Sequence, residues 1–418
     1  MNDQIPFSQT EAVRDLSAIL SLIKSGRAAT RPDLQRVSGL GRGLVAERVA
    51  QLMTTRLVIE GAAGVSTGGR APRLLELNAS VGLILCLFAT LAEVHFAVAD
   101  LKGNILSTSR DGGDFASGPH ALVANAHREW NRQLKALGKR PDDVWGVGAG
   151  IPAHINSAAG TLIDSPSLPS PWIGYAFGQE LSKPYDVPFW LDTDDNLLAY
   201  GELRAGTIPK DTTMLYLAAD MAIGCGIVIE GKLFRGAQGA SGNIGHIPGY
   251  NLSNVVCRCG RRGCIEAQYS GEALLRDTRS GIREGRSAAL AGIVGEREPT
   301  LADLSSAVRE GDPLAAELVS NAGLGIGQVL AATINMFNPS RVLVGGRLLD
   351  TGNLFFASLK EAAYRHCLPF VSSNLQIAAV DHDGSTGLSG AAHMAIDQIF
   401  LPEFMALWFS KSSPRKPW

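Results

Sequence analysis

No run of apolar residues in this 418-residue chain is long enough to cross a bilayer. The N-terminus, Met1–Pro6, also lacks the basic region and apolar core of an export signal. We therefore expect a soluble cytoplasmic protein with no membrane partner and no disulfide bonds. The length allows two or three domains, and 45% apolar residues can fill their cores.

The chain has no large excess of charge of either sign, because its formal net charge is −2. The charge is unevenly divided: residues 1–80 have a net charge of +3, and the remainder has −5. A small basic segment attached to an acidic body is typical of a nucleic-acid-binding module joined to another domain, although this charge alone does not identify one.

Cysteine is scarce, yet three of the six cysteines, Cys257, Cys259 and Cys264, lie within eight residues, and His246 precedes them by eleven. Three thiolates and one imidazole form a tetrahedral set of zinc ligands. A closed set of four leaves no position for water, so it indicates a structural rather than a hydrolytic metal. The alternatives are unligated, partly buried thiols or a disulfide, and the absence of an export signal disfavours the latter.

The N-terminal segment has the pattern of three short helices. Apolar residues recur at helical spacing in residues 11–24. Thr30 and Pro32 predict the start of a second helix, which Gly39 ends, and a third helix has its apolar face within residues 44–52. Two short helices joined by a glycine-containing turn indicate a helix-turn-helix.

Two short apolar runs, residues 57–60 and 74–77, flank a basic, glycine-rich loop and predict the wing of a winged helix. Arginines on such a loop suit contacts with phosphate or the minor groove. The alternative is an ordinary helical bundle with a hairpin. The residues that we expect to contact DNA are Arg42, Glu47, Arg48, Gln51, Arg70 and Arg73.

The remainder of the chain reads as an α/β body. A strand–turn–strand pattern at residues 83–100 recurs at 214–230 and hints at an internal duplication. Helices and strands alternate between and after these hairpins. The expected helices span 121–137, 323–337 and 386–399, and the expected strands span 144–151, 189–191 and 341–344.

Four segments of this sequence resemble the ROK family (repressor, open reading frame, kinase) over roughly residues 10–400. The segments are Gly68-Gly-Arg-Ala-Pro-Arg73, Gly148-Ala-Gly-Ile-Pro152, Ala240-Ser-Gly-Asn-Ile-Gly-His246 and Cys257–Glu266, of which the last is the most specific. The resemblance implies a two-lobed, actin-like (sugar-kinase, ribonuclease H-like) body with a monosaccharide-binding cleft. It also implies that chains with an N-terminal winged helix are sugar-responsive transcription regulators, usually homodimers or homotetramers.

The resemblance predicts four parts of the chain: a winged helix-turn-helix at 1–79, a first lobe at 80–203, a second lobe with the zinc loop at 204–400, and a C-terminal tail at 401–418. A dimer would place two recognition helices in successive major grooves, so the operator should be an inverted repeat in double-stranded DNA.

The phosphate-binding turns of the ROK kinases are changed here. Kinases have Asp-x-Gly-Gly-Thr-Lys in the first hairpin turn, whereas this chain has Phe-Ala-Thr-Leu-Ala-Glu at Phe88–Glu93. The second turn is Asp-Met-Ala-Ile-Gly at Asp220–Gly224, in place of Gly-Thr-Gly-Ile-Gly. A phosphate cradle needs close backbone N–H groups and positive charge, and Glu93 and Asp220 are negative. We therefore expect no kinase activity.

The sugar-binding positions are better preserved. The Asn-Asp pair of the kinases corresponds to Thr193 and Asp194, and the Glu of Gly-Glu-Ile-Gly-His corresponds to Asn243. His246 and Glu266 match the family pattern. A monosaccharide is held mainly by hydrogen bonds to its hydroxyls, which these five side chains can supply. Without the resemblance, Asp194 reads as a capping or turn carboxylate.

The favoured interpretation is a sugar-responsive repressor of carbohydrate-metabolism genes whose kinase-like body binds a monosaccharide effector. One rival is an ATP-dependent sugar kinase with an added DNA-binding domain, which the changed phosphate turns disfavour. The other is a DNA-binding protein that responds to a partner protein, which the preserved Asp194, His246 and Glu266 disfavour.

Overall fold

The computed structural model describes residues 7–63, 73–112, 115–156, 159–164, 168, 170–206, 208–209, 211–250 and 254–409. Most of the predicted wing loop, including Arg70, lies outside the described residues.

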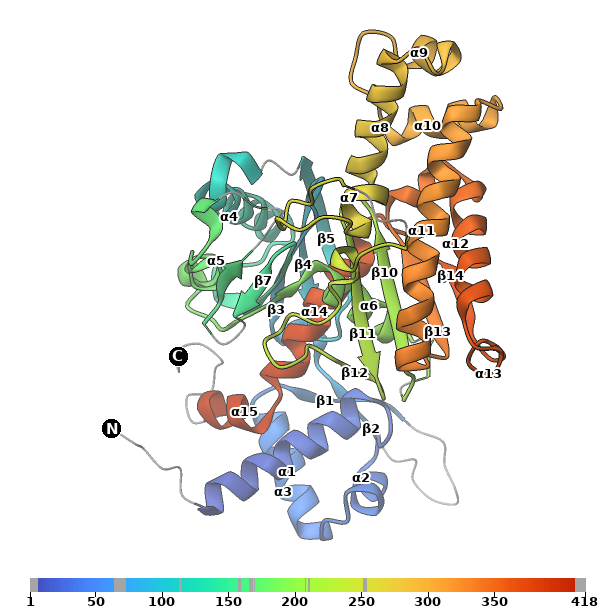
Figure 1. The fold of residues 1–418 in the computed structure, drawn as a ribbon. Helices are drawn as coiled ribbons and strands as arrows, with labels where there is room; N and C mark the ends of the chain where they lie inside the picture. The colour runs from blue at the N-terminus through green and yellow to red at the C-terminus, as the bar shows by residue number, and fades with distance from the viewer. Residues whose placement is uncertain are drawn as a thin grey trace.

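The N-terminal unit comprises three helices and a hairpin, at the bottom of Figure 1. Thr30 caps the second helix as expected, since its Oγ accepts a hydrogen bond from Asp33 N at 3.2 Å. Gly39 ends that helix in the left-handed region, at φ 72°. Leu20, Leu34, Val49 and others form the core of this unit. The elements are α1 (Phe7–Lys24), α2 (Arg31–Ser38), α3 (Arg42–Thr54), β1 (Val58–Ala63) and β2 (Arg73–Leu77).

The first lobe contains a five-stranded sheet in the order β5-β4-β3-β6-β9. Strands β3, β4 and β5 are antiparallel, and β6 and β9 continue the sheet in parallel with β3. The buried Trp130 of α4 donates a hydrogen bond to Cys86 O at 3.1 Å and fixes this helix on the sheet. The elements are β3 (Leu83–Ala89), β4 (Glu93–Asp100), β5 (Ile105–Gly112), α4 (Gly118–Ala136), β6 (Val144–Ile151), β7 (His154–Asn156), β8 (Thr161–Asp164), α5 (Phe177–Ser182) and β9 (Phe189–Thr193).

The second lobe repeats this arrangement in the order β12-β11-β10-β13-β14, with three antiparallel strands followed by two parallel ones. The common topology of the two sheets confirms the internal duplication that the recurring hairpins indicated. The strands are β10 (Met214–Ala219), β11 (Ile223–Ile229), β12 (Lys232–Leu233), β13 (Arg341–Gly345) and β14 (Gln376–Ala379).

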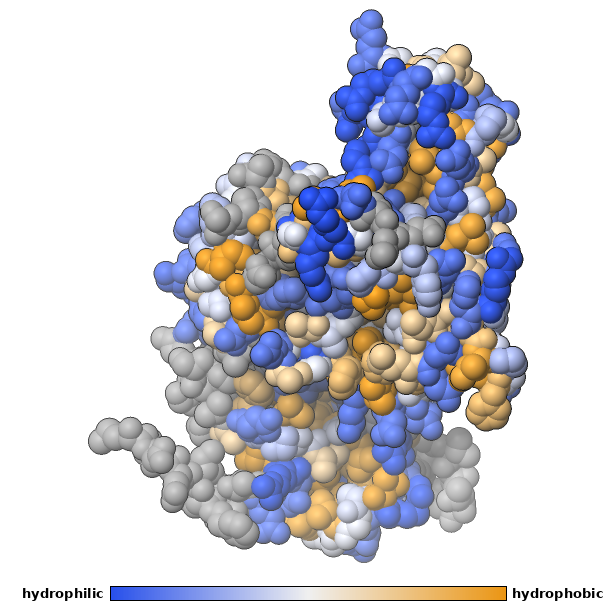
Figure 2. All heavy atoms as spheres, in the orientation of Figure 1, coloured by the Kyte–Doolittle hydropathy of each residue, from blue (hydrophilic) through white to orange (hydrophobic). Residues whose placement is uncertain are grey.

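The outer helices of the second lobe are α7 (Ile265–Tyr269), α8 (Gly271–Arg283), α9 (Ala288–Val294), α10 (Leu301–Arg309), α11 (Pro313–Phe337), α12 (Asn353–His366) and α13 (Pro369–Ser372). Helices α8 and α9 project at the top of Figure 1, and Figure 2 shows that their surface is largely hydrophilic. Apolar atoms are exposed at α13, where Phe370 is 87% exposed.

Helix α11 is longer than the sequence predicted. Asp312 caps it by accepting a hydrogen bond from Ala315 N at 2.8 Å, so that it spans 25 residues. Contrary to our reading of the sequence, it is long and apolar enough to cross a membrane. Most of that apolar stretch is buried within the protein, however, and Gly323 and Gly327 allow close contact with the backbone of α12. These are features of a core helix.

Helices α6 (Asp194–Arg204) and α14 (Ser385–Ile399) lie between the two sheets (Figure 1). They cross at glycines, because a Cβ on Gly201 or Gly390 would overlap the backbone of the other helix. One hydrophobic core runs from the N-terminal unit through both helices. The segment predicted as a C-terminal tail begins with α15 (Pro402–Phe409), which packs against α1.

Candidate functional site

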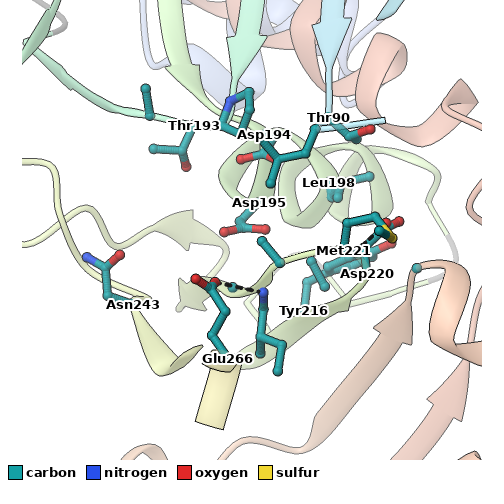
Figure 3. A pocket seen from close by; sticks show the side chains of 18 of the residues that line it. Thr90, Thr193, Asp194, Asp195, Leu198, Tyr216, Asp220, Met221, Asn243 and Glu266 are labelled. Carbon is teal, nitrogen blue, oxygen red and sulfur yellow. Dashed lines mark hydrogen bonds between the residues drawn. The ribbon is translucent and has the colours of Figure 1, made fainter. Parts of the chain in front are cut away.

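A cavity of about 120 Å³ lies between the lobes. Its walls come from the N-terminus of α6, the β3–β4 and β10–β11 turns, and the loop that leads into α7. All five predicted sugar-binding residues line it, and Figure 3 shows Asp195 and Glu266 facing the same space. The polar lining residues are Thr90, His154, Thr193, Asp194, Asp195, Tyr216, Asp220, Asn243, His246, Glu266 and His382.

The start of α6 positions two carboxylates in this cavity. Thr193 is the N-cap of the helix and accepts a hydrogen bond from Asn196 N at 3.3 Å. Asp194 and Asp195 therefore occupy the first turn, where the helix dipole favours negative charge. Asp192, just before the cap, accepts hydrogen bonds from Asn196 Nδ2 at 2.7 Å and from Arg235 Nε at 2.7 Å, which holds the turn in place.

Burial alters the protonation of both carboxylates. Desolvation raises the pKa of Asp194 to about 7, and the charge of Asp220 adds to this effect, while backbone amides oppose it. Desolvation also raises the pKa of Asp195 well above its usual value, reinforced by the charges of Asp194 and Glu266. Asp195 was not among the predicted site residues. The sequence indicates a role in the site only through its position directly after Asp194. That indication is weak, because the first turn of a helix usually faces solvent.

Asn243 joins the two lobes across the cavity. Its Oδ1 lies 3.0 Å from Nε2 of His154 in the first lobe, and its Nδ2 donates to Ala240 O at 2.8 Å. His154 was also absent from the predicted site, because it matches no motif and enters the site only through the β7–β8 hairpin. The amide in place of a glutamate at position 243 thus serves as a contact between lobes as well as a potential sugar ligand.

Glu266 and His246 approach from the loop that precedes α7. Glu266 is 4% exposed, and its Oε2 accepts a hydrogen bond from Ile223 N at 3.1 Å. Its Oε1 lies 3.5 Å from Arg258 Nε but has no hydrogen-bond partner among the described residues. His246 also lines the cavity, and its Nδ1 lies 3.6 Å from Cys257 Sγ.

The four predicted metal ligands converge. One ligand atom from each of His246, Cys257, Cys259 and Cys264 lies within 4.8 Å of all the others, and the sulfurs of Cys259 and Cys264 are 3.7 Å apart. Metal–sulfur bonds of about 2.3 Å in a tetrahedron give sulfur–sulfur distances near 3.8 Å, so this donor set fits a metal ion. The cluster could therefore hold a metal.

The β3–β4 turn offers few free backbone amides to a phosphate. The predicted reason was the negative charge of Glu93, but the structure shows a different one. Glu93 does not line the cavity; its carboxylate lies 3.5 Å from His95 Nε2 instead. The amides of Ala92 and Glu93 donate to Thr90 Oγ, at 3.3 and 3.4 Å, and Thr90 N donates to Glu93 O at 2.9 Å. These amides are therefore already hydrogen-bonded within the turn.

The second turn retains its carboxylate in the cavity, but the charge is paired. Arg347 donates to Asp220 Oδ1 from Nε at 3.0 Å and from Nη2 at 2.8 Å. The predicted carboxylate is thus present at this turn, but Arg347 neutralises its charge. Asp195 instead places its carboxylate against Gly224, where a Cβ would overlap Oδ2.

The candidate DNA-contacting residues differ in their surroundings. Arg42, at the start of α3, and Glu47 are exposed, and Gln51 is partly exposed. The Arg73 side chain is 61% exposed, with Nε 3.8 Å from Glu60. The Arg48 side chain is only 11% exposed and faces Asp15 of α1 at 3.7 Å. Its Nη1 also lies 2.7 Å from Glu47 Oε1, so the Arg48 guanidinium is engaged in ion pairs within the unit, and its contact with DNA stays a prediction.

Comparisons with known proteins agree with this architecture. The sequence matches the ROK family over residues 91–398. It is 26% identical over 387 residues to a xylose repressor of Caldicellulosiruptor bescii, covering 92% of this chain and 96% of that protein.

Solved structures are also similar. A ROK family transcriptional regulator described as a homologue of the E. coli MLC protein superposes with a TM-score of 0.79 at 21% identity, over 96% of this chain and 100% of that one. A ROK family glucokinase from Streptomyces griseus, in complex with glucose and AMPPNP, superposes with a TM-score of 0.63 at 25% identity, over 75% of this chain and 99% of that one. This chain belongs to the ROK family.

Proposed function

We propose that this protein is a sugar-responsive DNA-binding transcription regulator, a repressor of carbohydrate-metabolism genes, and that its kinase-like body senses a monosaccharide without phosphorylating it. The observation that supports this most directly is the pairing, in one chain, of the N-terminal unit with a polar interlobe cavity. The xylose repressor resembles the chain over nearly its whole length, N-terminal unit included.

The N-terminal unit acts as a winged helix-turn-helix in this proposal. Helix α3 is the recognition helix, with Arg42 exposed at its N-terminal end, which is the part that contacts base edges in this motif. The β1–β2 hairpin is the wing, from which Arg73 and the undescribed Arg70 contact phosphates. A homodimer or homotetramer presents two such units to an inverted-repeat operator in the cytoplasm.

The metal in the His246–Cys264 loop is zinc in this proposal, because three thiolates and one imidazole in a closed tetrahedral set are its preferred structural ligands. The metal would hold the loop that leads directly into Glu266. His246 would ligate through Nδ1 and leave its other ring nitrogen available to the sugar.

A sugar kinase with an added DNA-binding domain is the rival function. No lysine or arginine is among the described residues that line the cavity. The cavity lining therefore offers no positively charged side chain to bind the phosphates of a nucleoside triphosphate. The first hairpin turn has no glycine, and the amides of Thr90, Ala92 and Glu93 are bonded within the turn. The similarity to glucokinases covers the body of the chain, which fits either function.

One experiment separates these functions. Purified protein is titrated calorimetrically with a panel of neutral and amino monosaccharides, and each sugar that binds is tested for release of the protein from operator DNA and for sugar-dependent ATP consumption. We expect binding and a change in operator affinity without ATP consumption. Formation of any sugar phosphate would contradict the proposal, and so would a failure of every sugar to bind.

A further inference from the structure

The effector cavity is strongly acidic. Four carboxylates line it, and none of the lining residues in the described part of the chain is a lysine or arginine. Arg347 neutralises Asp220, and Arg258 lies near Glu266. Asp194 and Asp195 have no ion pair with any described residue. Two adjacent carboxylates thus face the cavity without a cation.

Asp195 is the less expected of the two. Its carboxylate has neither a hydrogen bond nor an ion pair with a described residue, and it occupies space that the lack of a side chain at Gly224 leaves open. An isolated, poorly solvated carboxylate is costly, and a protein removes this cost by protonating it or by pairing it with a cation.

Two other polar atoms in the cavity also lack partners. Tyr216 is fully buried, and its hydroxyl has no hydrogen bond in the described structure. Glu266 is 4% exposed, and its Oε1 likewise has no hydrogen-bond partner. Both residues line the same cavity as Asp195 (Figure 3). Buried polar atoms are normally hydrogen-bonded, so the unpaired Oε1 of Glu266, which Figure 3 shows facing the same space as Asp195, indicates a polar ligand.

A metal ion does not fit this cavity. Among the described residues, the His246–Cys264 cluster is the one group of His, Cys, Asp and Glu side chains close enough together to hold a metal. No three of the described cavity carboxylates therefore lie close enough together to ligate one ion. A ligand that spans them has to be larger, and it has to bring its own positive charge.

We propose that the effector is an amino sugar, whose protonated amine binds between Asp194 and Asp195 while its hydroxyls bind Asn243, His246 and Glu266. The proposal rests on the sensor function argued above and specifies its ligand class. The ammonium supplies the charge that the cavity lacks, and the sugar ring spans the distance that a metal ion cannot. Sugar phosphates and sugar acids are disfavoured by the same carboxylates.

Calorimetry with matched sugars tests this. Glucose is compared with glucosamine and N-acetylglucosamine, and the galactose and mannose series are compared in the same way, since N-acetylation removes the charge but keeps the nitrogen. We expect the amine of one series to bind at least about tenfold more tightly than its neutral parent, because a buried charge pair is weakly screened. The N-acetyl sugar should lose this advantage.

Two variants locate the effect. Asp195→Asn should remove the preference for the amine, because it removes one of the two carboxylates that would pair with it. Glu202→Gln is the matched control, because it removes a partly buried carboxylate from the same helix but does not line the cavity. It should leave the preference unchanged. Operator binding without effector shows that each variant is folded.

The outcomes are distinguishable. If neutral sugars bind and change operator affinity but no amine binds more tightly than its parent, the amino-sugar proposal is overturned and the sensor function stands. An unchanged preference in Asp195→Asn would also overturn it. If no sugar of any kind binds, the sensor function itself fails.

Discussion

Asp194 shows how a candidate ligand-binding residue can lower stability. Its pKa is raised to about 7 by burial, so the folded protein binds this proton more tightly than the unfolded chain does. The stability that this proton provides is fully present below about pH 4 and is lost as the pH rises through about 7. At neutral pH the protein thus maintains a partly ionised carboxylate in a poorly solvated cavity, which is expected of a side chain that awaits a ligand.

Asp194→Asn should therefore stabilise the effector-free protein at pH 8, by about 1–3 kcal/mol, and should stabilise it clearly less at pH 5. Thermal unfolding at the two pH values measures this. Glu361→Gln, which removes an exposed carboxylate on α12, should show no such pH dependence.

The same Asp194 variant should bind sugar more weakly but bind operator normally without sugar. Lower stability of Asp194→Asn at pH 8 would show that the carboxylate has a structural role.

At the scale of elements, the His246–Cys264 loop joins the candidate metal site to the interlobe cavity. Its last cysteine, Cys264, is the N-cap of α7, and Glu266 lies in the first turn of that helix. Hydrogen bonds from Cys257 N to Arg261 O at 2.7 Å and from Gly260 N to Cys257 O at 2.8 Å fold the loop around the ligands. Loss of a metal bound in this loop would therefore affect Glu266 and His246 together.

Cys259→Ser should lose the metal and, with it, effector binding, before operator binding is affected. Metal analysis of purified wild-type protein should give about one zinc per chain, and the variant should give much less. The fully buried Cys86 lies outside the loop, so Cys86→Ser is a control that should keep its zinc. Wild-type protein prepared without chelators and free of zinc would contradict the assignment.

Helix α6 connects the cavity to the N-terminal unit. It begins at Asp194 and ends at Arg204, where Asp397 of α14 binds Arg204, Tyr200 and Lys24 of α1, the last at 2.5 Å. Eleven helical residues span about 16 Å and move as one body. In the proposed sensor, a shift of the α6 N-terminus on effector binding would thus be transmitted to α1 through Asp397.

Asp397→Asn should weaken the effect of sugar on operator affinity by about fivefold or more, while sugar binding itself changes little. Gel shifts with and without effector, beside calorimetry of sugar binding, measure the two quantities separately. Glu361→Gln serves again as the control, since its ion pair with Arg365 is exposed and far less constrained. An undiminished sugar response in a folded Asp397 variant would exclude this route.

At the scale of the whole molecule, one hydrophobic core extends from the N-terminal unit into the space between the lobes. Ser17 of α1 adds a hydrogen bond to Phe400 O at 2.8 Å. The N-terminal unit is therefore fixed to the body rather than joined by a free linker. Movement of one lobe relative to the other would change the separation of two winged helices in a dimer, and hence their fit to half-sites about 34–36 Å apart.

Arg42→Ala and Arg73→Ala should weaken operator binding in different ways. Arg73→Ala should reduce affinity for all DNA sequences alike, because a phosphate contact contains no sequence information. It should also reduce the slope of log affinity against log salt concentration by about 1. Arg42→Ala should cost about 1–3 kcal/mol on the operator and less on unrelated DNA. Arg365→Ala on the body should change neither. Unaltered affinity and salt slope in Arg73→Ala would show that the wing does not contact DNA.

Much of this protein could be predicted from local sequence patterns. The cap at Thr30, the hairpin strands and the metal ligands depend on residues close together in the chain, so spacing and residue type are sufficient to find them. The duplicated topology was visible in the recurring hairpins for the same reason.

What the sequence could not provide depended on contacts between distant segments. Glu93 turned away from the cavity toward His95, Arg347 neutralised Asp220, and Arg48 was buried against Asp15. Asp195 and His154 joined the site only because α6 and the β7–β8 hairpin meet the second lobe there. Local sequence thus determined which chemical groups this protein has and in which elements, whereas the packing of the two lobes decided which charges are paired, because burial and pairing depend on neighbours that spacing along the chain does not specify.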